Sequence, residues 1–181
     1  MGNPSAKYEQ TRHNAGFWFL DEIAARHRLV FHSDQRTQGW VAKLAFEAET
    51  VFLLKPMSFM NRSGGAVAAL AHYCKIPPEQ ILVAHDELDF EPGVVKLKAG
   101  GGHGGHNGLR DIISKLGSAD FYRLRIGIGH PGNREDVVDY VLDRPSRHDG
   151  EILRAAVMRA ADLLQDMLHG KLESVMNVLH V

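Results

Sequence analysis

The segment Ile81–Ala84 constrains the fold of this chain more than any other part of its sequence. Four apolar residues stand in a row there, and the polar residues His85, Asp86 and Glu87 follow at once. A continuous apolar run of this length is typical of a strand that is covered on both faces, and such strands occur where helices lie on each side of a sheet. The segment therefore predicts a layered α/β fold.

The rest of the chain alternates between helical and strand patterns, as such a fold requires. Apolar residues at helical spacing predict helices over about residues 14–28, 64–74, 107–116, 137–142 and 149–168, the second capped by Ser63. Strands are predicted over 40–46, 50–54, 94–98 and 122–128. Because no repeat or linker separates these elements, residues 1–181 are expected to form a single-domain α/β/α sandwich with a mixed, largely parallel, twisted sheet.

Composition excludes several other classes of protein. The only cysteine, Cys74, has no partner within the chain, which excludes a disulfide framework, and its place on an apolar helix stripe indicates packing. No apolar run approaches the ~20 residues of a membrane span. The opening residues lack the basic end and apolar stretch of a signal peptide. A cytoplasmic protein without membrane contact is therefore expected.

The charge balance hides an uneven distribution. The formal net charge is -1, which by itself disfavours a polyanionic partner. Residues 94–134, however, contain seven Lys and Arg against two Asp, so this segment carries +5 and the rest of the chain -6. The segment is either one basic face or ordinary charge clustering on a solvated surface.

Polar side chains gather near the carboxyl ends of the predicted strands, where α/β sheets bind ligands. They are Asn3, His13, Asn61, Asp86, His106 and Asn107. A histidine beside a carboxylate can activate water, and asparagine amides can stabilise a developing oxyanion. The alternative is that all six are satisfied turn residues.

Two other functions compete for the glycine-rich loop. Gly100, Gly102 and Gly105 match the dinucleotide pattern G-x-G-x-x-G, with Asp120 twenty positions after the first glycine. Lysines in the preceding strand and the position of Asp120 ahead of the next strand both weaken a nucleotide-dependent oxidoreductase.

A metal site is the second alternative, formed by His103 and His106 with His85 or Asp86. A flexible glycine loop holds metal ligands poorly unless its neighbours fix it, so this reading is also disfavoured.

Five stretches of the sequence resemble the bacterial peptidyl-tRNA hydrolases, in the right order over nearly the whole chain. They are Gly2-Asn3-Pro4 with Tyr8 and Thr11–Asn14, Lys55–Asn61 with Ser63-Gly64, Val83–Asp89, Gly100–Leu109 and Arg123–Gly129. The resemblance implies a carboxylic ester hydrolase that cleaves the bond between a peptide and the 3′ ribose of tRNA. It also implies an enzyme without a cofactor, a metal or a covalent intermediate.

The resemblance assigns roles to individual residues. His13 is expected to be the general base that activates water, Asp86 to orient it, and Asn61 to stabilise the oxyanion. Substrate binding near the 3′ end is expected of Asn61, Asn107, Tyr8 and Phe59, with His106 in support. Asn3 resembles the asparagine that distinguishes a blocked amine from a free one, because a charged amine would be poorly solvated there.

The same resemblance implies a role for the basic segment, residues 94–134. Lys98 and Arg125 are expected to grip a tRNA phosphate, with Lys96 and Arg110 nearby, and phosphate contacts would serve many tRNAs because they read no sequence. The partner expected is peptidyl-tRNA, bound by a monomer with no obligate protein partner. The competing function is a catalytically silent tRNA- or RNA-binding module, although phosphate binding alone would not need His13, Asp86 and Asn61.

Two departures from the family pattern stand at the start of the chain. Family members carry an apolar first strand before the Gly-Asn-Pro turn, so we expect a strand to be missing here and a slot to stay open in the sheet. Ser5 stands where the family usually has glycine, and a slightly different turn is expected.

Overall fold

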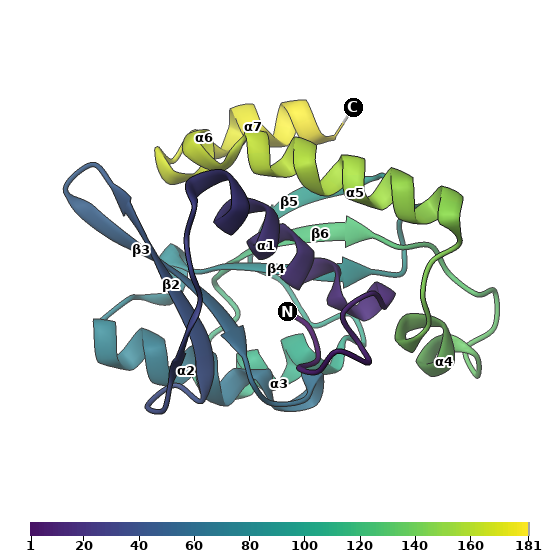
Figure 1. Cartoon of the computed structure of the whole chain (residues 1–181), viewed down its shortest axis with the longest axis horizontal. Coiled ribbons are helices and arrows are strands. Elements are labelled where there is room, and N and C mark those ends of the chain that lie inside the picture. The colour runs from purple at the N-terminus through teal and green to yellow at the C-terminus, as the bar shows by residue number, and fades with distance from the viewer. Residues whose placement is uncertain (181) are drawn as a thin grey trace.

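The computed structural model describes residues 1–180 as one α/β unit (Figure 1). Its strands are β1 (His32–Asp34), β2 (Gly39–Phe46), β3 (Glu49–Pro56), β4 (Leu82–Glu87), β5 (Val95–Ala99) and β6 (Tyr122–Gly127). Its helices are α1 (Ala15–His27), α2 (Ser63–Cys74), α3 (Asn107–Leu116), α4 (Val137–Leu142), α5 (Arg147–Asp162), α6 (Leu164–Leu168) and α7 (Leu172–Leu179). Short 3₁₀ turns are η1 (Arg12–Asn14), η2 (Met60–Arg62) and η3 (Pro78–Gln80).

The strands form two three-stranded sheets. In the first, β1, β2 and β3 pair antiparallel in chain order. In the second, the order is β4-β6-β5, with β4 parallel and β5 antiparallel to the central strand β6. The predicted mixed sheet is thus present, but β4 with β6 is the one parallel pair among the described residues, so the sheets are not largely parallel.

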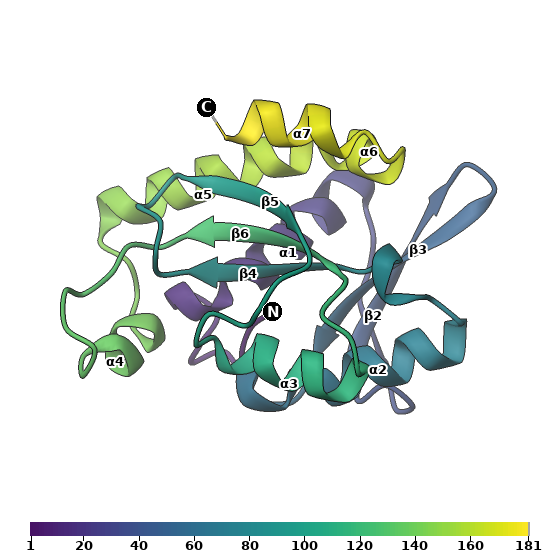
Figure 2. The same cartoon turned by 180° about the vertical axis from the view of Figure 1, so that it is seen from behind.

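Helices cover one face of the second sheet, whereas the other face is covered only near Val83 and is open over β5 and β6 (Figure 2), so the predicted three-layer sandwich is not complete. Helices α1 and α5 pack on the face that carries Leu124 and Ile126, which are fully buried (Figure 1). The other face carries Val83, against which α3 packs with Leu109 and Ile112 (Figure 2). Since side chains alternate along a strand, His85 on β4 shares this second face with Val83.

Element boundaries follow the sequence patterns closely, with a few corrections. The helix predicted over 149–168 is two helices, α5 and α6, and β1 and α7 were not predicted. Ser63 is the first residue of α2 and not its cap, because its Oγ donates to the carbonyl of Met60 at 2.9 Å. The cap position is taken by Arg62, whose side chain makes no capping hydrogen bond.

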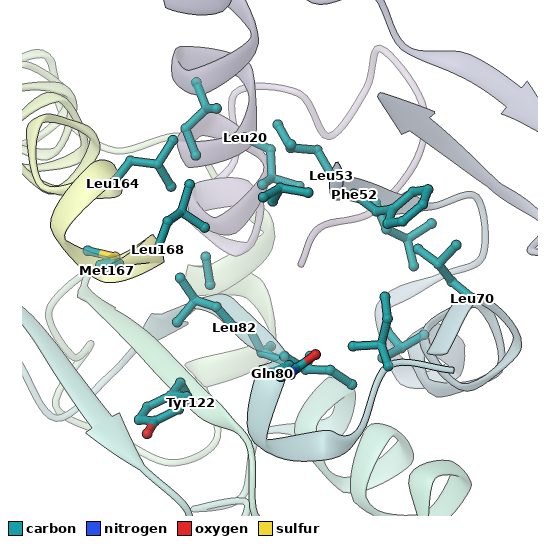
Figure 3. A pocket seen from close by; sticks show the side chains of 18 of the residues that line it. Leu20, Phe52, Leu53, Leu70, Gln80, Leu82, Tyr122, Leu164, Met167 and Leu168 are labelled. Carbon is teal, nitrogen blue, oxygen red and sulfur yellow. The ribbon is translucent and has the colours of Figure 1, made fainter. Parts of the chain in front are cut away.

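Strands β3 and β4 each pair on one side within the described residues, and an apolar cavity of about 540 Å³ lies between them. Leu53, Leu82 and Leu164 are among its lining residues (Figure 3). The amino group of Met1 lies beside this cavity and donates to the carbonyl of Ala84 at 2.5 Å. Burial lowers the pKa of this ammonium group to about 5.

No helix within residues 1–180 is both long enough and apolar enough to cross a membrane.

Candidate active site

His13 and Asp86 meet although 73 positions separate them in the chain. Asp86 lies on β4 with its side chain 2% exposed, and its Oδ2 is 2.8 Å from Nδ1 of His13. The turn η1 carries His13 to this point because α1, which follows it, packs directly on β4. A side chain at Gly16 would collide with the carbonyl of Ala84, so glycine permits this close approach.

His106 binds the other oxygen of the same carboxylate. Its Nε2 lies 3.0 Å from Oδ1 of Asp86, while its Nδ1 accepts from the backbone N–H groups of Gly108 and Leu109 at 3.2 and 3.4 Å. His106 is therefore the cap of α3, and the helix end fixes the direction of its ring. One carboxylate thus bridges two imidazoles.

The two histidine contacts favour the ionised form of the Asp86 carboxylate. Burial would raise the pKa of Asp86, but His13 and His106 act against burial and hold this pKa well below its ordinary value. Because ionised Asp86 only accepts hydrogen bonds, Nδ1 of His13 must carry a proton. A neutral His13 then has its lone pair on Nε2.

His85 contributes a third imidazole next to Asp86. Its Nδ1 donates to the backbone carbonyl of Asp86 at 2.6 Å, and its ring is 1% exposed. Burial, followed by the nearby His106, lowers the pKa of His85 to about 3. This ring is therefore neutral at any pH where the protein would be expected to work.

Asn3 links the two segments that carry His13 and Asn61. Its backbone N–H donates to Oδ1 of Asn14 at 2.8 Å, and its own Oδ1 accepts from the backbone N–H of Met60 at 2.7 Å. Asn14 follows His13 and Met60 precedes Asn61, so this buried bracket fixes η1 relative to η2. The side-chain oxygen of Asn3 is occupied by a structural contact.

The other expected substrate-binding residues have exposed side chains, except Tyr8, which is partly buried. Asn61 lies in η2 and Asn107 begins α3, directly after His106. Phe59 is 60% exposed, and its ring lies edge-on to Tyr8 with 6.4 Å between the centroids. An aromatic pair with one exposed ring offers a surface for an apolar or stacking group.

A row of cations crosses β5 and β6. Lys96 lies opposite Arg125 and Lys98 opposite Arg123 in the antiparallel register, so all four share one face. Arg125 donates from Nε to Glu87 at 2.9 Å, and both Arg125 and Lys96 lie over the ring of Phe90. Arg110 is exposed on α3, away from these strand pairings.

A sequence profile described as peptidyl-tRNA hydrolase matches residues 1–181. The chain belongs to the peptidyl-tRNA hydrolase family. It is therefore an enzyme, a hydrolase that acts on ester bonds.

Named relatives of this family agree over the full length of the chain. A peptidyl-tRNA hydrolase of Neisseria meningitidis serogroup B is 55% identical over 180 residues, covering 99% of this chain and 94% of that protein. One of Methylococcus capsulatus is 55% identical over 181 residues, covering 100% of this chain and 96% of that protein. A crystal structure of peptidyl-tRNA hydrolase from Acinetobacter baumannii matches with a TM-score of 0.92 and 43% identity, covering 99% of this chain and 91% of that one.

The dinucleotide alternative fails on topology. In a nucleotide-binding unit, the glycine loop joins two parallel strands through a helix. Here β5 and β6, on either side of the loop and α3, are antiparallel. Membership in the hydrolase family points the same way.

The metal alternative involves a different set of residues from the one expected. His13, Asp86 and His106 place their ligand atoms within 4.8 Å of one another, a spacing that a metal ion could use. His106 would have to give up its cap contact to free Nε2 as a ligand, because its proton would then move to Nδ1. His103 accepts from Gly105 within its own turn and does not join this group.

Four residues near the site were not predicted. Asn14 and Met60 complete the bracket of Asn3, and their positions beside His13 and Asn61 were the available signal. His85 was considered only as a metal ligand. Arg123 is 2% exposed and donates to the carbonyl of Gly101 at 2.5 Å, so it supports the glycine loop, which its basic character alone did not indicate.

Proposed function

We propose that this enzyme hydrolyses the ester bond of peptidyl-tRNA, releasing free tRNA and peptide, through a water molecule activated by His13. The observation that carries the proposal is the contact between His13 and the buried carboxylate of Asp86 at 2.8 Å. In the cell, this reaction would recycle tRNA from chains released before translation is complete. Cytoplasmic action as a monomer is part of the same proposal.

The first step is proton removal from water. Asp86 accepts from Nδ1–H of His13, which leaves Nε2 free to take a proton from a bound water. The resulting hydroxide attacks the carbonyl carbon of the ester. Because Asp86 stays ionised, it also stabilises the imidazolium that forms.

The second step is breakdown of the tetrahedral intermediate. The side-chain amide of Asn61 can donate to the oxyanion without carrying a charge of its own. The bracket through Asn3 holds η2 and η1 together, so Asn61 and His13 act on one substrate position. The bond from carbon to the ribose 3′ oxygen breaks, and the imidazolium returns its proton to that oxygen.

Substrate binding divides into two regions. Asn107, Tyr8 and Phe59, with Asn3 and His106 behind them, would receive the acceptor end and the peptide. The cation row over β5 and β6, with Lys98 and Arg125 as the main contacts and Lys96 beside them, would bind tRNA phosphates, and Arg110 on α3 would add a separate phosphate contact.

A catalytically silent tRNA-binding module is the competing function. The deciding experiment incubates N-blocked aminoacyl-tRNA with the protein and measures both binding and release of the blocked amino acid. Release by the wild type, lost in His13→Ala, supports the enzyme. Binding of the tRNA without release by the wild type would support the module and contradict the proposed hydrolysis.

A further inference from the structure

His106 is the middle one of three imidazole rings around Asp86. The ring centroids of His13 and His85 lie 5.2 and 5.1 Å from that of His106. His13 and His106 contact one carboxylate oxygen each, whereas His85 contacts the backbone carbonyl of the same residue. The three rings therefore hold one aspartate from its side chain and its main chain.

The hydrogen bonds of His106 determine which ring nitrogen carries its proton. The partners of Nδ1 are the backbone N–H groups of Gly108 and Leu109, which can only donate. Nδ1 must therefore accept, and the proton of the neutral ring is on Nε2, which faces Oδ1 of Asp86. Both nitrogens are occupied, so this ring has no lone pair left for a proton of the substrate or of water.

We propose that His106 is a positioning residue that acts through Asp86 and sets the pH range in which His13 can serve as a base. This inference rests on the proposed function. The Nε2–H of His106 draws negative charge from Oδ1 of Asp86, which makes the carboxylate a weaker acceptor toward His13. Without that donor, Asp86 would stabilise the protonated form of His13 more strongly, and the neutral base would be lost at a higher pH.

Two other titratable groups lie near Asp86. The amino group of Met1 is bonded to the carbonyl of Ala84, and His85 is bonded to the backbone carbonyl of Asp86 and buried beside His106. Both are present in the wild type and in every variant at position 106. Because His106 also helps to lower the pKa of His85, replacing it acts on His85 as well, but this change is common to His106→Asn and His106→Gln, and the comparison of these two variants isolates the donor to Asp86.

Two substitutions at position 106 separate the contacts of its ring. His106→Asn keeps an oxygen near the position of Nδ1 and can still cap α3, since asparagine is a favoured cap, but it loses the donor to Asp86. His106→Gln places an amide donor near the position of Nε2 and loses the cap. His103→Asn is the matched control, because His103 lies in the same loop and contacts Gly105, not Asp86.

The readout is kcat/KM for N-blocked aminoacyl-tRNA as a function of pH. For His106→Asn we expect the acid limb to move about one unit to higher pH, a loss of about tenfold on that limb, with a smaller effect at alkaline pH. His106→Gln and His103→Asn should keep the limb in the wild-type position. An unmoved limb in His106→Asn, or loss of hydrolysis at every pH in both variants at position 106, would overturn the inference.

A second measurement needs no variant and does not depend on activity. Long-range ¹H–¹⁵N NMR of protein labelled in histidine reports which ring nitrogen carries the proton. We expect His106 protonated on Nε2 and neutral His13 protonated on Nδ1, and a proton on Nδ1 of His106 would overturn the inference. If the wild type releases no amino acid from tRNA, the proposed function fails on its own, while the NMR result stands independently.

Discussion

Asp86 organises the candidate active site because each of its oxygen atoms has its own partner. Its two oxygens and its backbone carbonyl each accept from a different histidine. Of these rings, His13 combines a proton on Nδ1 with a partly exposed position. The three histidines therefore differ in role because their hydrogen-bond partners differ, and a sequence motif does not contain these partners.

Burial of His85 makes stability depend on pH. Its pKa is about 3 in the folded protein and 6.5 when unfolded, so the unfolded chain binds more protons between these values. The free energy of unfolding should therefore fall as pH drops from 6.5 toward 3, by at most about 3 kcal/mol at pH 4. Denaturant unfolding of the wild type and of His85→Gln at several pH values measures this difference. Equal slopes for the two proteins over that range would contradict it.

Ser5 occupies a backbone conformation that suits glycine. Its φ is 132°, where a side chain is strained. Ser5→Gly should therefore raise the free energy of unfolding by about 1 kcal/mol, or about 2–4 °C in Tm. Ser5→Ala is the control, because it keeps the strain and should give no gain. A Ser5→Gly protein that melts below the wild type would show that the turn is not strained.

At the scale of elements, the pairing of β5 with β6 gathers cationic side chains on one face, although the net charge of the whole protein is close to zero. The antiparallel register brings Lys96, Lys98 and Arg125 together from segments about 27 residues apart. Glu87 is paired with Arg125, which leaves the lysines uncompensated by any ion pair within residues 1–180. Of the seven cations in residues 94–134, Lys96, Lys98 and Arg125 thus share one open face of the sheet.

This face predicts the salt dependence of tRNA binding. In Lys98→Ala with Arg125→Ala, the slope of log affinity against log salt concentration should become shallower by about 1 to 2, because each phosphate contact releases about one counterion. Arg147→Ala with Lys171→Ala removes the same charge from α5 and the start of α7 and should leave the slope in place. Binding titrations at several salt concentrations provide the measurement. A slope that is equal in both double variants would exclude this face as the tRNA contact.

For the whole molecule, the sequence patterns predicted most helices and strands, because local burial and polarity determine these elements. The apolar run at Ile81–Ala84 and the alternation in Tyr122–Gly127 identified strands because burial dictates such patterns. Pairing partners are set by contacts between distant segments, so the separation into two sheets and the antiparallel placement of β5 were not predicted. His13, Asp86 and Asn61 stood out as polar residues near predicted strand ends and received their roles from the family resemblance, whereas the bracket of Asn3, Asn14 and Met60 depends on contacts between distant segments.

The oligomeric state of the protein is a further property of the whole molecule that can be tested. We expect a monomer, whose mass by sedimentation equilibrium should be about the 20.1 kDa of one chain at micromolar concentration. This expectation rests on the family resemblance. It also rests on the site, because no site residue among residues 1–180 needs a second subunit. A mass near twice that value, independent of dilution, would contradict it.

The central claim is that His13, held by Asp86, activates water for ester cleavage. The most direct test measures single-turnover release from N-blocked aminoacyl-tRNA by the wild type and His13→Ala, together with the Kd of each protein for the same tRNA. The account predicts that release slows by about 10²- to 10⁴-fold in the variant while Kd stays within about threefold, because a general base contributes to the reaction and not to phosphate binding. Release by His13→Ala at the wild-type rate would contradict the account.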